Sequence, residues 1–453
     1  MPSGLLFSFA AAIQASLSVL LVISYGVIAA HHSLLSSATT RTISKVCVRM
    51  FLPALILTSI GAELAPSSAG DYLFILLWAL FCHLVSFVLG IIAHLVLKMP
   101  DWTTPAVMFN NTASYPLLLV AALEQTGILQ RLLDGGADGG HNHDGLRAVA
   151  RMKSYFLVFS TVSSCLTFAV GPRLIDSEHA PEASKDDAEE IDAECRGACE
   201  EATETTGLLS EASSSRWDEN RFFPSRRASS TRSASASTHR RASIVSPSKW
   251  DRLSPRLQWW ALFICDFFNA PLLGALAGTM IGLTPVLKTA FFDRLSNGGI
   301  FTAWLTASLK SIGSLFIPLP VVITGVSLYT AMTTTHGLAG SEDPRGHRRE
   351  LPLKTAMYIM VVRFLVWPVA SIGLIYLLVT HTHILGDDPM LWFALMLMPT
   401  GPPAMKLITL VQVSNAGEEE ETAIAKLLTL SYLISPVLSF TVTAALFVCE
   451  NLA

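Results

Sequence analysis

Apolar residues occur along this chain in about ten runs, each long enough to cross a bilayer, which requires about 20 residues of helix. The first run follows no Lys or Arg and is too long for the apolar core of a signal peptide, so we expect it to remain as a span. The predicted spans cover about 5–30, 44–64, 72–98, 104–124, 149–171, 262–285, 302–332, 354–380, 388–412 and 423–449.

A polar segment, residues 172–253, divides the spans into two blocks. It is rich in Ser, Arg, Glu, Asp and Ala and includes an acidic run at 186–190. Because this composition buries too little apolar surface to offset its ordering entropy, the segment is predicted to be a disordered loop. Five spans precede it in residues 1–171 and five follow it in residues 254–453. An odd number per block inverts the second block in the membrane, which predicts an all-α membrane protein of two inverted five-helix repeats.

The orientation of the spans depends on the distribution of Lys and Arg. The Lys and Arg residues of the short loops alone hardly favour one orientation over the other. The long loop 172–253 adds many Arg residues and contains no usable glycosylation sequon. Basic residues favour the cytosolic side, although long loops carry less weight than short ones. We therefore expect this loop in the cytosol and both chain ends on the opposite side.

The fourth span of each block should break near its middle, at Pro116 in span four and at Pro399–Pro403 in span nine. Because proline removes a backbone donor and disfavours helix at the preceding residue, neither segment should remain one helix. A proline kink would explain either segment alone, but two interruptions at matching positions predict crossing broken helices that line a substrate site near the bilayer centre. The residues predicted to form this site are Asn110, Asn111, Thr112, Ser114 and Pro116 in span four, and Pro399, Thr400, Gly401, Pro402, Pro403 and Lys406 in span nine.

The predicted cavity carries net positive charge. Each restarted half-helix presents unpaired amides equivalent to about half a positive charge. Lys406 lies within a turn of the second break, and no acidic residue occurs between 102 and 122 or between 390 and 415. We therefore expect an anion such as a carboxylate to bind there. The alternative for Lys406 is that its side chain extends towards a lipid headgroup.

Other residues within the spans are interpreted as structural. Arg49, Lys310 and Arg363 are attributed to helix pairing or to extension towards the membrane surface, with a role in substrate binding as the alternative. Glycines at four-residue spacing across 274–282 predict close packing of two helices.

Composition excludes several classes of protein. Of the 453 residues, 51% are hydrophobic and only 15% are charged, whereas soluble proteins carry about 25% charged residues. The net charge of -4 offers no basic surface for nucleic acid. The seven cysteines match neither a disulfide framework nor a zinc site, and the chain lacks the short motifs of metalloproteases, serine hydrolases and phosphate-binding loops. We expect no enzyme activity, no metal and no cofactor.

Four stretches resemble the auxin efflux carrier superfamily, and in particular fungal-type members of its PIN-LIKES branch. The most specific is MPTGPPAMKLITLVQVSNAGEEEETAIAKLLTLSYLISP at 398–436, which is similar to the proline-rich ninth span, acidic turn and tenth span of that family. The others are NNTASYPLLLV at 110–120, FNAPLLGALAGTMIGLTP at 268–285 and FIPLPVVITGVSLY at 316–329. The resemblance extends over nearly all of the chain outside the polar loop.

The resemblance implies a ten-span fold with scaffold and transport domains, and transport of auxin-type indole carboxylates or related weak acids. It places the crossover at Asn111, Pro116, Pro402 and Pro403, with Asn111 as the group that hydrogen-bonds a carboxylate. Lys406 departs from the plant PIN-LIKES pattern, where an uncharged residue is expected, so the substrate can differ. The resemblance implies the endoplasmic reticulum membrane first and the plasma membrane second.

Together these features predict a secondary carrier that exports or sequesters an organic anion. A receptor or channel built on the same fold is the alternative. The expected partners are the small anion, membrane lipids, a second copy of the chain and a basophilic kinase. That kinase would modify Ser229 and Ser243, which each follow an Arg-Arg-Ala sequence and would gain about -1.5 to -2 charges on phosphorylation. Chance occurrence of this short pattern in the polar loop is the alternative.

Overall fold

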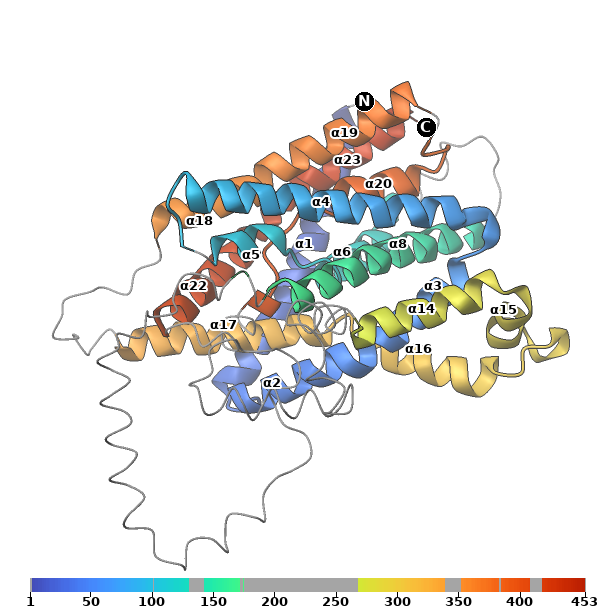
Figure 1. The fold of residues 1–453 in the computed structure, drawn as a ribbon, viewed down its shortest axis with the longest axis horizontal. Coiled ribbons are helices and arrows are strands. Elements are labelled where there is room, and N and C mark those ends of the chain that lie inside the picture. Colours follow the sequence, from blue (N-terminus) through green and yellow to red (C-terminus); the bar gives the residue numbers. More distant parts are fainter. Residues whose placement is uncertain are drawn as a thin grey trace, which may run out of the picture.

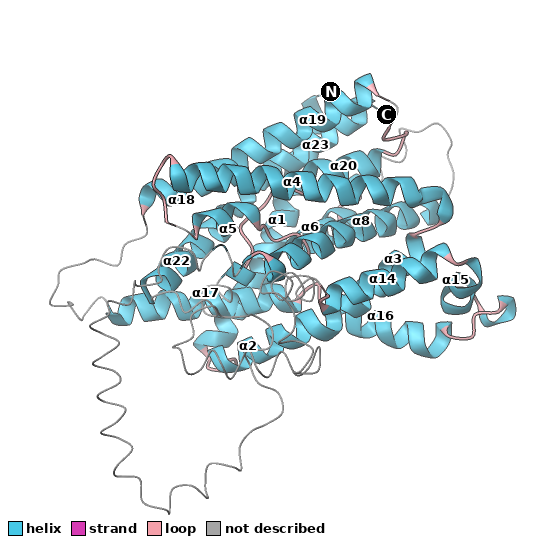
Figure 2. Cartoon of the chain, in the orientation of Figure 1, coloured by secondary structure: helices cyan, strands magenta, loops and turns pink. Residues whose placement is uncertain are grey.

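The computed structural model describes residues 2–100, 102–129, 142–171, 174, 268–338, 352–382, 384–407 and 418–452, and every regular element within them is a helix (Figures 1 and 2). Ser229 and Ser243 lie outside these residues. The helices before the polar loop are α1 (Pro2–His31), α2 (Ser37–Val46), η1 (Cys47–Phe51), α3 (Leu52–Glu63), η2 (Pro66–Ser68), α4 (Ala69–Leu95), α5 (Thr103–Met108), α6 (Ser114–Gln125) and α8 (Asn142–Ala169). Those after it are α14 (Ala270–Leu283), α15 (Pro285–Phe292), η4 (Leu295–Asn297), η5 (Thr302–Thr306), α16 (Ala307–Ser314), α17 (Leu319–Leu338), α18 (Leu353–Val361), η6 (Val362–Val366), α19 (Trp367–His381), α20 (Pro389–Leu397), α22 (Glu418–Ile434), η7 (Ser435–Val437) and α23 (Leu438–Leu452).

Six helical segments in the described part of the chain are long and apolar enough to cross a membrane, and α14 with α15, which are bent by 105°, make a seventh if they count as one span. These seven correspond to predicted spans one, two, three, six, seven, eight and ten. Spans four and nine fall short because span four is broken into helices of six and twelve residues, and the described helix of span nine, α20, has nine residues. Span five, α8, is 28 residues long but carries Arg147, Arg151 and Lys153 in its first half.

The outer faces of the long helices are apolar and the centre holds the two broken segments. Along α4, for example, Leu73, Leu77, Leu84 and Ile92 are exposed, as expected where hydrocarbon rather than water covers the surface. By contrast, every residue of α5 is buried, and so is every residue of α20 after Pro389. The short helices α5 and α20, which are not long enough to cross a membrane alone, therefore lie in the core.

Longer helices surround this core in two groups. The first group consists of two closely packed sets, α3 with α14 and α16, and α1 with α17. The helices α4, α5, α18, α19 and α20 form the other side, and in Figure 1 α4 and α18–α19 run across the top of the molecule while α17, α16 and α14 lie at the bottom. The helices α8 and α23 contact members of both groups.

Glycines bring the first group into very close contact. A Cβ atom added at Gly26 of α1 would lie 1.9 Å from the carbonyl oxygen of Val322, and one added at Gly325 of α17 would lie 2.0 Å from that of Ile23. The glycines across 274–282 of α14 pack in the same way on the backbone of α3. The close helix packing predicted from their spacing is confirmed.

Replacing Gly325 with alanine should therefore destabilise the protein. The added methyl group has no space beside the backbone of α1, and overpacking of this kind costs about 1–3 kcal/mol. We expect Gly325→Ala to lower the Tm of the purified protein in detergent. Gly373→Ala in α19 is the matched control because a Cβ there meets nothing within 4 Å, so its Tm should be unchanged or raised. Equal Tm values for the two variants would contradict this packing.

Candidate functional site

The first broken segment consists of α5, an extended stretch and α6. Helix α5 ends at Met108, the chain is non-helical over residues 109–113, and α6 begins at Ser114. The break was predicted at Pro116, which is wrong by a few residues, because Pro116 lies within the first turn of α6. Proline is tolerated there since the first amides of a helix have no partner within the helix.

The second broken segment consists of α20, which ends at Leu397, and the non-helical chain that follows it. After Leu397 the chain leaves the helix and passes through Pro399, Gly401, Pro402 and Pro403 before a helical turn begins near residue 405. Gly401 has a φ of +105°, a backbone conformation that side chains with a Cβ disfavour. The prediction that the chain unwinds at Pro399–Pro403 is confirmed. Residues 408–417 lie outside the described part of the chain.

The two breaks meet through their main chains. Asn110 and Pro403 form an antiparallel bridge. The amide of Asn111 donates to the carbonyl of Pro402 at 3.0 Å, and the amide of Ala404 donates to the carbonyl of Phe109 at 2.9 Å. The predicted meeting of two segments nearly 290 residues apart is therefore confirmed.

Side chains satisfy the carbonyl groups that the second break frees. Asn110 Nδ2 donates to the carbonyls of Met398, at 3.0 Å, and Thr400, at 2.8 Å. One turn earlier, the Ser371 hydroxyl donates to the carbonyl of Met396 at 2.6 Å and Trp78 Nε1 to that of Leu395 at 3.1 Å. Because unpaired carbonyls in an apolar core are costly, these donors explain how α20 can end there.

Arg363 joins the two breaks from a third helix. It lies in the π-helical turn η6, its side chain is 1% exposed, and its guanidinium donates to the carbonyl of Val107 in α5 and to that of Pro399, the latter at 3.2 Å. The predicted extension of Arg363 to the membrane surface is wrong, because this side chain is buried and pairs α5 with the end of α20. The signal that could have identified it is a lone arginine well inside an apolar span, which is a functional candidate by default.

The side chain of Asn111 forms hydrogen bonds to other groups of the protein. Its Nδ2 donates to the hydroxyl of Tyr432 at 2.9 Å, while its Oδ1 accepts from the hydroxyl of Ser114 at 3.2 Å and from the amide of Tyr115 at 3.4 Å. Thr112 is buried beside it. Asn111 therefore caps the amino end of α6 and connects it to α22.

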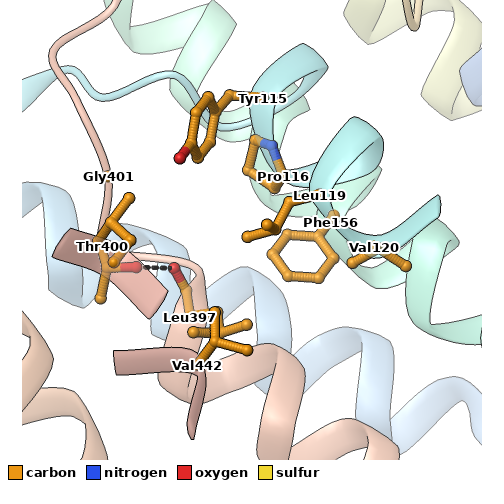
Figure 3. A pocket seen from close by; sticks show the side chains of 10 residues that line it. Tyr115, Pro116, Leu119, Val120, Phe156, Leu397, Thr400, Gly401 and Val442 are labelled. Atoms are coloured by element: carbon orange, nitrogen blue, oxygen red, sulfur yellow. Dashed lines mark hydrogen bonds between the residues drawn. The ribbon is translucent and has the colours of Figure 1, made fainter. Parts of the chain in front are cut away.

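A small pocket lies beside the crossover, where Tyr115 and Pro116 face Thr400 and Gly401 (Figure 3). Its empty volume is about 330 Å³ including open solvent at its mouth, of which only about 20 Å³ admits the centre of a water molecule. The lining is largely apolar, and is formed by Tyr115, Pro116, Leu119, Val120, Phe156, Leu397, Thr400, Gly401, Leu438 and Val442. This conformation has room for about one water, so a larger ligand requires the lining helices to separate.

Lys406 binds to α8 and does not line this pocket. Its Nζ donates to the hydroxyl of Ser164 in α8 at 2.8 Å, and Lys406 is not among the residues that line the pocket. The structure thus brings the asparagines and prolines of the predicted site together and places the lysine against α8. No acidic residue occurs between residues 102 and 123 of the first broken segment or between residues 389 and 407 of the second.

A multi-pass helical protein with two broken helices that cross at its core has the architecture of a secondary transporter. The chain belongs to the membrane transport protein family, that of the auxin efflux carriers, whose model matches residues 11–443. It is 23% identical over 439 residues to an uncharacterized transporter of Schizosaccharomyces pombe, covering 93% of this chain and 91% of that protein. It is also 23% identical over 417 residues to Protein PIN-LIKES 2 of Arabidopsis thaliana, covering 88% and 86% of the two chains. The resemblance found in the sequence is confirmed.

Asn110→Ala should weaken the crossover. The substitution removes the donor for the carbonyls of Met398 and Thr400, and each buried carbonyl left unpaired costs about 1–3 kcal/mol. We expect a clear loss of thermal stability in detergent. The control is Asn451→Ala, because Asn451 Nδ2 also donates to a helix carbonyl, that of Phe447, but is exposed. A Tm for Asn110→Ala equal to that of this control would show that the bonds contribute nothing.

Proposed function

We propose that this protein is a secondary carrier that moves an organic anion by alternating access around the crossover of the two broken segments. The observation that carries the proposal is the crossover itself, a hydrogen-bonded meeting of unwound backbone in an apolar core that contains Arg363 and Lys406 but no described acidic residue. Unwound backbone at such depth is tolerated where it lines a cavity or is buried in protein. An anion would meet the amino end of α6 with its partial positive charge.

The packing of the helices supports two inverted repeats of five spans. If α1, α3, α4, α5–α6 and α8 correspond in order to α14, α16–α17, α18–α19, α20 and α22–α23, the contacts occur in matching pairs. The contact of α1 with α17 corresponds to that of α14 with α3, and the contact of α1 with α23 to that of α14 with α8. Likewise α3 with α8 corresponds to α17 with α22, α4 with α8 to α19 with α23, and α4 with α5 to α19 with α20. A pseudo-two-fold axis through the crossover accounts for all five correspondences.

Alternating access requires one group of helices to move against the other. We assign α1, α3, α14 and α16–α17 to a scaffold, because glycine contacts lock α1 to α17 and α14 to α3. The remaining helices, which hold both breaks, form the transport domain. The boundary is lined by small side chains on α1, where Ala12 and Ser16 are buried and the Ser16 hydroxyl lies 3.0 Å from that of Ser439 in α23. Such a surface permits small rigid-body displacements that would open the pocket.

The substrate we propose is an auxin-type indole carboxylate or a related weak acid. The pocket supports an apolar and partly aromatic body, because Tyr115, Phe156 and Leu119 line it, and the nearby Asn111 supplies an amide that could exchange Tyr432 for a carboxylate. Family membership supports the same class. We place the carrier in the endoplasmic reticulum membrane, with the plasma membrane as second candidate, and expect a second copy of the chain and a basophilic kinase as partners.

A carrier and a channel on this fold differ in one measurement. In proteoliposomes, uptake of labelled indole-3-acetate by the full chain should saturate and should accelerate when unlabelled substrate is present on the opposite side. Asn111→Ala should reduce uptake about tenfold or more, because a hydrogen bond to a charged group contributes about 1.5–3 kcal/mol. The Asn451→Ala protein should behave as wild type.

Uptake that neither saturates nor accelerates would favour a channel, and binding without uptake would favour a receptor. If wild-type protein neither binds nor transports any member of a panel of organic acids, the proposed substrate class is wrong.

A further inference from the structure

Arg363 is held in place by a local irregularity of its helix. The continuous helix of α18, η6 and α19 contains one π-helical turn at Val362–Val366. As a result both Val362 and Arg363 are buried, while Leu365 and Val366 are exposed. Such turns occur frequently at functional sites. Here the turn directs a guanidinium into the protein instead of towards lipid.

The acceptors of this guanidinium are backbone carbonyls at the carboxyl ends of two helices. Val107 belongs to the last turn of α5, and Pro399 follows the last turn of α20. Carbonyls at a helix end lack partners within the helix and carry partial negative charge, up to about half an elementary charge per end. No carboxylate of the described residues forms an ion pair with Arg363. Two converging helix ends therefore provide the compensation that a buried cation requires.

The same charges lie close to the pocket. Leu397, Thr400 and Gly401, which line it, flank Pro399 on both sides. Without Arg363, the carboxyl ends of α5 and α20 would present uncompensated negative charge to any ligand there. With Arg363, that charge is neutralised and the amino end of α6 determines the local potential.

We propose that Arg363 is the counter-charge of the crossover: a positioning residue that holds the ends of α5 and α20 together and determines that the pocket accepts anions in preference to neutral or cationic ligands. The preference for anions rests on the proposed function, whereas the joining of the two helix ends does not. The two parts are therefore tested by separate measurements.

The first measurement compares ligands that share an indole ring and differ in charge. Binding of indole-3-acetate, its methyl ester and the cation tryptamine is measured on full-length wild type, Arg363→Lys and Arg363→Gln. Removing one charge beside the pocket should reduce indole-3-acetate affinity about tenfold, change ester affinity less than about threefold and raise tryptamine affinity. Arg363→Lys, which keeps the charge, should retain the wild-type order of the three ligands. A folded Arg363→Gln protein with the wild-type order would overturn the specificity role.

The second measurement requires no substrate. Thr400, which is 5% exposed, is replaced by cysteine, and its reaction with a membrane-permeant maleimide is followed relative to the parent protein. We expect slow reaction with Arg363 or Lys at position 363, and reaction at least fivefold faster in Arg363→Gln and Arg363→Met, because the helix ends separate. Equal rates in all four proteins would overturn the joining role, even if wild type binds none of the three ligands. Failure of wild type to bind indole-3-acetate, with the rates as expected, would count against the proposed substrate alone.

Discussion

Backbone amides and carbonyls that lose their helical partners must find others when no water surrounds them, and the crossover depends on this constraint. Each broken segment alone would leave several such groups in an apolar core at a cost of several kcal/mol apiece. Together they pair through the bridge between Asn110 and Pro403, and neighbouring side chains complete the pairing. The burial of α5, and of α20 after Pro389, follows because the surrounding helices must exclude lipid from the junction.

The same junction sets the charge of the protein's centre. Arg363 compensates the partial negative charge at the carboxyl ends of α5 and α20. The neutral side chain of Asn111 caps the amino end of α6, and Lys406 lies against α8. These positions contribute positive or neutral groups and no carboxylate. Stability and ligand preference thus arise from one set of contacts, so a substitution that alters the site also alters the junction. For that reason each functional variant needs a measurement of folding beside it.

The sequence was sufficient to locate the six or seven long apolar helices of the described residues and to show that spans four and nine are interrupted, because apolar run length and proline are local properties. It also predicted the close packing of α14 from its glycine spacing. It could not place the first break, because a proline in the first turn of a helix, as Pro116 is in α6, does not end that helix. It also missed the role of Arg363, whose carbonyl acceptors lie 36 and 256 residues away in the sequence. The direction of Lys406 likewise depends on α8, 242 residues distant. Such contacts are set by the crossing of helices, which local patterns do not encode.

The pairing of the two breaks is tested most directly by a disulfide between Asn110→Cys and Pro403→Cys, in a chain whose seven natural cysteines are replaced. Directly opposed residues of an antiparallel bridge lie about 4.5–5.5 Å apart at Cα, within disulfide range. After oxidation in membranes and cleavage at a protease site introduced between 172 and 253, the two halves should stay linked until reduced. The pair Ser16→Cys and Ser439→Cys, whose parent hydroxyls are 3.0 Å apart, is the positive control. Halves that separate without reduction, while the control pair stays linked, would contradict the crossover.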